Sequence, residues 1–217
     1  PVSDADPVIG DRAYGTSPDK VARIAGAIAA GLVEGGVLPV VKHLPGHGRA
    51  NVDSHKRLPV VSADREILER TDFAAFKPLA GLPCGMTAHV VFSAIDPATP
   101  ASTSSTIVRE VIRDWIGFQG LLMSDDISMG ALSGSIEERT RAAIAAGCDL
   151  VLHCNGDIAE MRAVADAVPE LSGRARTRAD AALAARRTPL DIDLPQAKAR
   201  FAAALAGVWS DAKVMTA

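Results

Sequence analysis

Residues 38–55, with the sequence LPVVKHLPGHGRANVDSH, decide the fold that we predict for this chain. The apolar run at 38–41 (LPVV) has the length and the β-branched content of a buried strand. It ends at Lys42 and His43, and a loop rich in Gly and Pro follows. Because a rigid strand fixes the polar pair and a loop can carry further functional groups, this is the layout of an active site.

Three further groups that can transfer protons or bind metals lie in that loop. His47 stands between two glycines, and Asp53 and His55 close the stretch. Two interpretations stay open on this spacing. The histidines, including His43, and the carboxylate could bind zinc or a similar ion. Alternatively, Asp53 could orient the His55 imidazole and raise its basicity for proton transfer.

Strands and helices alternate in the rest of the sequence. Short apolar strands are predicted at about 38–42, 86–91, 120–124 and 149–153. Helical patterns are predicted at 17–34, 67–79, 103–117, 135–147, 156–168, 175–187 and 195–206. Ser17 and the pair Ser135 and Glu138 are predicted helix caps. Apolar strands separated by helices are typical of a parallel sheet covered by helices, so we expect an α/β fold.

Polar side chains follow the predicted strands, at Lys42-His43, His89, Asp125-Asp126 and His153. The carboxyl ends of parallel strands are where (β/α)8 barrels gather their active sites. Doubly wound sheets also bind ligands there. The sequence contains no Gly-rich phosphate-binding loop, which favours the barrel.

The composition argues against several classes of partner. A net charge of −3 and a pI near 6.0 argue against binding to nucleic acid or to an anionic membrane surface. No apolar run approaches the roughly 20 residues that cross a bilayer. Cys84, Cys148 and Cys154 lie in or beside apolar segments, so we expect buried free thiols, which fit a reducing compartment such as the cytoplasm.

The motif KHLPGHG at 42–48, followed by DSH at 53–55, resembles the signature of the β-N-acetylglucosaminidases of glycoside hydrolase family 3. The resemblance continues through IGDRAYG at 9–15, MTAHV at 86–90, SDDISM at 124–129 and DLVLHC at 149–154. It implies a (β/α)8 barrel of the TIM type. It also implies an exo-acting enzyme that needs no cofactor and removes terminal N-acetylglucosamine from peptidoglycan or muropeptide fragments, or from chitobiose-like glycosides.

Four strands are predicted here, whereas the closed barrel needs eight. The family's usual N-terminal segment, with the other strands and an acidic substrate-binding residue, is not in the sequence. We therefore expect residues 1–217 to form one partial catalytic domain that covers about the C-terminal half of the barrel. A half barrel would expose two sheet edges, which favours aggregation of the isolated chain.

Asp125 is the candidate nucleophile. It closes an apolar strand, so we expect its carboxylate to point into the mouth of the barrel. Asp126 is the alternative by position, and the resemblance favours Asp125 because the family's nucleophile directly follows Ser or Thr. By resemblance, Asp125 forms a covalent glycosyl-enzyme and the anomeric configuration is retained.

His55 is the candidate proton donor and later the general base, with Asp53 as its orienting partner. Most glycosidases use a carboxylic acid in this role, whereas the resemblance implies the loop dyad. An imidazole of ordinary pKa, ~6.5, can both give and take a proton near neutrality. By resemblance, Arg12, Lys42 and His43 hold the sugar hydroxyls and the N-acetyl group.

Other assignments stay open. His89 and His153 either line the pocket or bond to backbone carbonyls, and His47 is expected to support the loop. A related function is a phosphorylase, because a neutral donor such as His55 repels phosphate less than a carboxylate does. The ligands of a metal-dependent barrel hydrolase, a function of a different class, would be His43, His47, His55 and Asp125. A non-catalytic sugar-binding protein is the remaining alternative.

Overall fold

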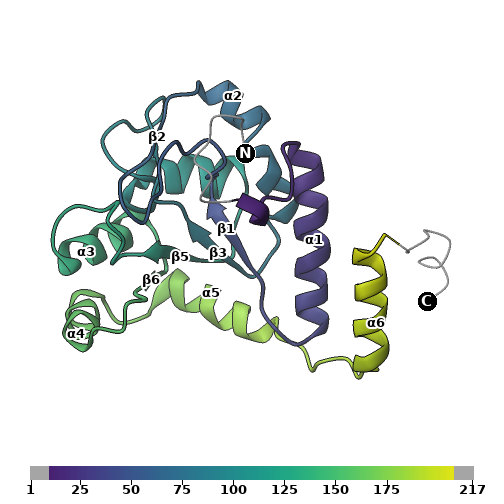
Figure 1. Ribbon diagram of the computed structural model, residues 1–217. Helices are drawn as coiled ribbons and strands as arrows, with labels where there is room; N and C mark the ends of the chain where they lie inside the picture. The colour runs from purple at the N-terminus through teal and green to yellow at the C-terminus, as the bar shows by residue number, and fades with distance from the viewer. Residues whose placement is uncertain (1–9, 208–217) are drawn as a thin grey trace.

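Four parallel strands in the order β1-β3-β5-β6 form the centre of the computed structural model, which describes residues 10–207 (Figure 1). Their bounds are β1 Val40–Leu44, β3 Cys84–Thr87, β5 Leu121–Asp126 and β6 Leu150–Leu152. Helical segments connect each strand to the next, so the carboxyl ends of the strands lie along one edge of the sheet. The predicted parallel α/β arrangement is confirmed.

A second, two-stranded parallel sheet was not predicted. It pairs β2 (Val60–Val61) with β4 (Val91–Phe92). The single strand predicted at 86–91 is therefore wrong in its bounds. The reason is a change of hydrogen-bond partner, because the Ala88 N–H donates to Leu44 O at 2.7 Å, whereas the Val91 N–H donates to Pro59 O at 2.9 Å.

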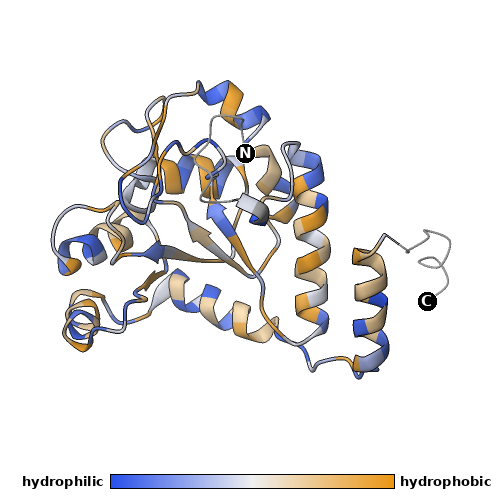
Figure 2. Ribbon diagram, viewed as in Figure 1, coloured by the Kyte–Doolittle hydropathy of each residue, from blue (hydrophilic) through white to orange (hydrophobic). Residues whose placement is uncertain are grey.

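Helix α1 packs against η2, α3 packs against α4, and α5 runs along β5 (Figure 1). The α-helices are α1 Pro18–Glu34, α2 Arg65–Arg70, α3 Ile136–Ala146, α4 Ile158–Ala167, α5 Gly173–Ala184 and α6 Leu194–Leu205. Shorter or differently wound helices are η1 Gly10–Arg12, η2 Ala74–Leu79, η3 Ala101–Thr103 and η4 Ile107–Trp115. In Figure 2, hydrophobic and hydrophilic bands alternate along α1, as expected for a helix that packs one face. None of the helices within residues 10–207 is long and apolar enough to cross a membrane.

Two predicted helices differ from expectation in detail. The helix predicted at 67–79 is interrupted after α2, where the Thr71 hydroxyl lies 2.6 Å from Ile67 O and 2.8 Å from Asp72 Oδ2, and the Arg49 side chain donates to the same Asp72 oxygen. The helix predicted at 103–117 contains the wider η4, in which the N–H of residue 116 reaches Val111 O at 2.8 Å, five residues back.

The two predicted helix starts have different outcomes. Ser135 and Glu138 form the predicted capping box at α3, with the Ser135 N–H donating to Glu138 Oε2 at 2.8 Å and the Glu138 N–H donating to Ser135 Oγ at 3.3 Å. Helix α1 begins at Pro18 as predicted, but the Ser17 side chain makes no capping hydrogen bond. The proline therefore marks this helix start better than the serine does.

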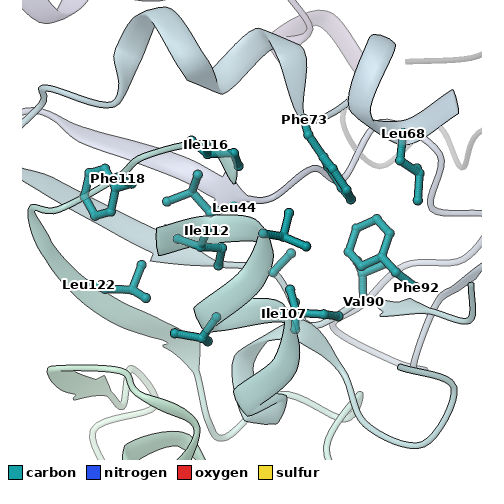
Figure 3. Packing of buried hydrophobic residues seen from close by; sticks show 14 of the residues in the cluster. Leu44, Leu68, Phe73, Val90, Phe92, Ile107, Ile112, Ile116, Phe118 and Leu122 are labelled. Carbon is teal, nitrogen blue, oxygen red and sulfur yellow. The ribbon is translucent and has the colours of Figure 1, made fainter. Parts of the chain in front are cut away.

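The main hydrophobic core lies between one face of the sheet and the segments α2, η2 and η4 (Figure 3). Its fully or almost fully buried members include Leu44, Leu68, Phe73, Val90, Phe92, Ile107, Ile112, Ile116, Phe118 and Leu122. Burial of each such side chain contributes about 1.5–3 kcal/mol. On the other face, α5 packs Ala179 and Ala182 against Cys84 and Leu121. Both faces of the sheet are thus covered, which holds the strand ends in place.

Of the three cysteines, Cys84 and Cys148 are buried and free, as predicted, but Cys154 is exposed. The prediction of a buried thiol is therefore wrong for Cys154. It lies two residues beyond the end of β6, in the turn that leads to α4, where the apolar strand no longer shields it.

A buried charge cluster joins the beginnings of β5 and β6 to η4 and α5. Asp149 is 8% exposed and accepts hydrogen bonds from Arg113, from Arg178 and from the Leu122 N–H, each at 2.9 Å. Because both carboxylate oxygens are satisfied, the cost of burying the charge is offset by these contacts.

Asp149→Ala is expected to lower the free energy of unfolding by about 3–5 kcal/mol, because it leaves Arg113 buried without its partner. Urea unfolding should show a lower midpoint with an unchanged slope. The matched control is Asp180→Ala, which breaks an exposed pair with Arg176 on the same helix, α5, and should cost at most about 1 kcal/mol. Equal shifts in the two variants would show that the buried cluster contributes no special stability.

Candidate active site

A small cavity of about 90 Å³ opens at the carboxyl ends of β1 and β5. It is lined by Arg12, Lys42, His43, His47, Ser54, His55 and Asp125. The structure thus brings five of the six predicted site residues to one cavity. The sixth, Asp53, lies behind His55 and is hydrogen-bonded to it.

A larger hollow, of about 550 Å³, shares Arg12, Lys42, His43 and His47 with this cavity but does not reach Asp125 or His55. Its other walls come from residues 13–18, α1, β1 and the loop that follows it, residues 71–72 and η2. Size alone would favour the larger hollow. The smaller cavity is the better candidate for chemistry because it joins a carboxylate to several groups that can transfer protons.

Asp125 presents one carboxylate oxygen to the cavity. Its Oδ1 accepts the Asp126 N–H at 2.9 Å, which fixes the side chain. Its Oδ2 lies 3.7 Å from His43 Nε2, beyond hydrogen-bonding distance. Burial lowers the pKa of His43 to about 4, although the neighbouring Asp125 opposes the shift. His43 is therefore neutral at neutral pH, and Asp125 Oδ2 is not held in an ion pair with it.

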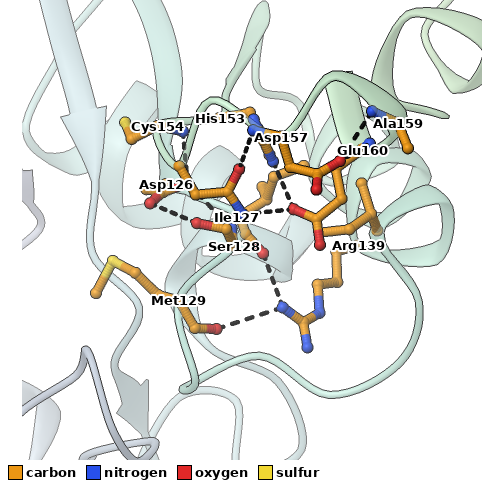
Figure 4. Close-up of polar contacts among 12 residues, drawn as sticks. Asp126, Ile127, Ser128, Met129, Arg139, His153, Cys154, Asp157, Ala159 and Glu160 are labelled. Carbon is orange, nitrogen blue, oxygen red and sulfur yellow. Dashed lines mark hydrogen bonds and ion pairs between the residues drawn. The ribbon is translucent and has the colours of Figure 1, made fainter. Parts of the chain in front are cut away.

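Asp126, the neighbouring carboxylate, is engaged by protein donors (Figure 4). Its Oδ1 accepts the N–H groups of Ser128 at 3.0 Å and Cys154 at 3.1 Å, and its Oδ2 accepts the Ser128 hydroxyl at 2.7 Å. These bonds tie the turn after β5 to the turn after β6. Asp126 is therefore placed for a structural role, whereas Asp125 is placed to meet a ligand.

Asp53 and His55 form the dyad that the spacing suggested. The distance between His55 Nδ1 and Asp53 Oδ1 is 2.8 Å, and the His55 backbone N–H donates to the same oxygen at 3.0 Å. These hydrogen bonds, the backbone one first, lower the pKa of Asp53 and keep it ionised. Because an ionised carboxylate only accepts, Nδ1 carries a proton and Nε2 is left for proton exchange with another group. The His55 side chain is 65% exposed, so Nε2 can reach a ligand or water.

His89 and His153, for which two roles were open, do not line the cavity. His89 is fully buried, its Nε2 donates to Asp126 O at 2.9 Å and its Nδ1 lies 2.7 Å from Ser102 Oγ. His153 Nε2 pairs with Glu160 Oε2 at 2.7 Å (Figure 4). Both therefore support the turns that follow β3 and β6.

Ser54 is the cavity residue that the sequence did not single out. It is 4% exposed, and its Oγ lies 3.1 Å from His47 Nε2. The only signal in the sequence is its position between the two dyad residues Asp53 and His55.

A carboxylate and a proton-transfer group that flank one cavity are the arrangement with which glycoside hydrolases cleave sugars. Residues 2–187 match the family described as glycosyl hydrolase family 3 N terminal domain. The chain belongs to glycosyl hydrolase family 3.

Curated and solved relatives agree with this assignment. The chain is 45% identical to a β-hexosaminidase of Alkalilimnicola ehrlichii over 152 residues, which are 68% of this chain and 43% of that protein. A crystal structure of NagZ from Neisseria gonorrhoeae in complex with N-trifluoroacetyl-D-glucosamine is 35% identical, with a TM-score of 0.74 over 96% of this chain and 62% of that one. Zinc-bound CbsA from Thermotoga neapolitana is 32% identical, with a TM-score of 0.74 over 84% of this chain and 44% of that one. The chain thus spans less than half the length of the curated relative.

Proposed function

We propose that the protein is a retaining exo-β-N-acetylglucosaminidase that acts in the cytoplasm on peptidoglycan or muropeptide fragments. The observation that carries the proposal is the shared cavity, which is lined both by Asp125 and by His55, the imidazole that is hydrogen-bonded to Asp53. The name β-hexosaminidase of the curated relative and the N-acylated glucosamine bound by the Neisseria gonorrhoeae protein support the sugar class. The free cysteines support a reducing compartment.

In the first step of this mechanism, Asp125 attacks the anomeric carbon and the bond to the leaving oxygen breaks. His55 Nε2 gives its proton to that oxygen, and a glycosyl ester forms on Asp125. In the second step, His55 Nε2 takes a proton from water, whose oxygen attacks the anomeric carbon and releases Asp125 as carboxylate. Two inversions give net retention.

Arg12, Lys42 and His43 are proposed to hold the sugar. All three line the cavity beside Asp125. The planar fork of Arg12 suits two neighbouring oxygens, whereas Lys42 makes a single charged contact. The neutral imidazole of His43 can donate one hydrogen bond to a sugar hydroxyl, since the gap to Asp125 leaves its Nε2 free of a direct bond.

We also propose that the four-stranded sheet is part of a (β/α)8 barrel. Strands β1 and β6 form the outer edges of the sheet described here, and the matched relatives are much longer than the part that aligns. In a barrel, each outer edge would pair with a further strand, and the face that α5 covers here would instead face the side chains of the other strands in the barrel interior. A structure of the full-length protein in which β1 and β6 remain unpaired would overturn this proposal.

The test of the proposed activity is product analysis. The full-length protein should release N-acetylglucosamine of retained β-configuration from the non-reducing end of chitobiose. Adding phosphate should leave the product unchanged. N-acetylglucosamine 1-phosphate as the main product would assign the phosphorylase function instead, and binding without any turnover would assign a sugar-binding function.

Turnover is expected to be unchanged by EDTA. Within residues 10–207, no group of three or more His, Cys, Asp or Glu side chains is arranged to hold a metal ion. The zinc-bound relative makes the measurement worthwhile. Loss of activity in EDTA and its return with one equivalent of zinc would replace the dyad mechanism with a metal mechanism.

A further inference from the structure

The loop that carries the dyad is anchored at two adjacent residues. From one side, His47 Nε2 lies 3.1 Å from the Oγ of Ser54. From the other side, the backbone N–H of Gly130, in the turn that follows Asp125, donates to His55 O at 3.1 Å. A side chain at Gly130 would lie 3.0 Å from the carbonyl oxygens of His55 and Lys56, so the approach of the two segments is close. The loop is therefore held on one side by His47 and on the other by the turn that follows β5.

The Ser54 side chain is buried and hydrogen-bonded to His47. Ser54 is buried although its neighbour His55 is exposed, so its side chain points inward from the loop. His47 lines the cavity with its ring centroid 5.5 Å from that of His43, and its Nδ1 is buried without a hydrogen-bond partner among residues 10–207. Its contact with Ser54 is thus the side-chain hydrogen bond that the described structure gives to this ring.

Because of the position of Ser54 in the chain, its hydrogen bond with His47 affects the geometry of the dyad. Ser54 is the residue between Asp53 and His55, so a hydrogen bond that holds its side chain also restrains the backbone between the two dyad members. The dyad itself depends on that backbone, because the His55 N–H and Nδ1 both bond to Asp53 Oδ1. His47 is therefore coupled to the direction of His55 Nε2 through a single hydrogen bond.

We propose that His47 is a positioning residue, which holds the dyad loop through Ser54 so that His55 faces Asp125 across the cavity. This inference rests on the proposed function and adds to it the residue that sets the geometry of proton transfer. His47 exchanges no proton with the substrate in this scheme. A displacement of about 1 Å of a catalytic group can lower a rate by about 10²-fold, so the bond can matter without any contact to the sugar.

The test compares His47→Leu and Ser54→Ala in the full-length protein on chitobiose and on the 4-nitrophenyl glycoside of N-acetylglucosamine. Each variant should lose about 10²-fold in kcat/KM on chitobiose, whose leaving oxygen needs a proton, and much less on the aryl glycoside. His47→Gln, which can still reach Ser54, should recover most of the loss. The double variant His47→Leu/Ser54→Ala should be no worse than either single one, because both remove the same bond.

Ser62→Ala, at an exposed serine just after β2, is the matched control and should behave as the wild type. Thermal melting of each variant reports whether it folds. If His47→Leu does not fold, the kinetics of Ser54→Ala alone test the positioning role. Equal losses on both substrates, or losses that multiply in the double variant, would overturn the positioning role. A wild-type protein that cleaves neither substrate would instead overturn the proposed function. If the wild type is active and His55→Ala loses more activity on chitobiose than on the aryl glycoside, the proposed function stands, and the His47 and Ser54 variants then test the positioning role alone.

Discussion

Asp125→Ala is expected to lower kcat/KM on the order of 10⁴–10⁶-fold, the scale on which covalent catalysts lose turnover when their nucleophile is removed. Asp125 lines the cavity, its Oδ1 accepts the Asp126 N–H, and its Oδ2 lies 3.7 Å from His43 Nε2. One carboxylate can therefore reach the anomeric carbon. Truncation to alanine leaves no group there that could replace it.

The matched control is Asp126→Asn at the neighbouring position. Asparagine keeps the size of the side chain and one carbonyl oxygen that can accept the N–H groups of Ser128 and Cys154. This variant should retain most of the turnover and lose some stability, because an amide nitrogen cannot accept the Ser128 hydroxyl proton. The measurement compares the rates of Asp125→Ala and Asp126→Asn on the aryl glycoside. Thermal melting checks that both variants fold.

Trapping identifies the nucleophile directly. A 2-fluoro or 5-fluoro sugar that accumulates on the enzyme should be found by peptide mass mapping on Asp125. If the label lies on Asp126, the assignment made from the hydrogen bonds of these two residues is wrong.

The sequence predicted the sheet and most of the site because both depend on local patterns. A run such as LPVV at 38–41 is apolar and β-branched whatever its neighbours are, and four such runs between helices can form only a few folds. Polar residues at their ends must then meet at one edge of a parallel sheet. Lys42, His43 and Asp125 were found in this way.

The features that the sequence did not predict depend on contacts between residues far apart in the chain or on how a loop folds back on itself. The structural role of Asp126 rests on the Cys154 N–H, 28 residues away in the chain. The pairing of β2 with β4 joins two strands of two residues each, which are too short to give a periodic pattern. The contact of His47 with Ser54 depends on how the loop turns back, which Gly and Pro residues permit but do not specify.

His55→Ala is expected to lower kcat/KM by about 10²–10⁴-fold on chitobiose, the usual contribution of general acid and base catalysis. The loss should be much smaller for bond cleavage in the 4-nitrophenyl glycoside, because a nitrophenolate leaves without a proton. Among residues 10–207, the His55 ring is hydrogen-bonded to Asp53 through Nδ1, and its side chain is 65% exposed and lines the cavity, which leaves Nε2 accessible. The ratio of the losses on the two substrates measures proton donation by this nitrogen.

The same variant should also be slow in the second step, since the imidazole that activates water is gone. Azide needs no base, so it should accelerate turnover of the aryl glycoside by His55→Ala and yield a β-glycosyl azide. Asp53→Ala should show a weaker form of the same pattern, because Asp53 orients the ring and transfers no proton to the sugar. If His55→Ala loses equal activity on both substrates and azide has no effect, His55 is structural. The proton donor must then be another group in the cavity, and His43, whose Nε2 lies 3.7 Å from Asp125, is the next to test.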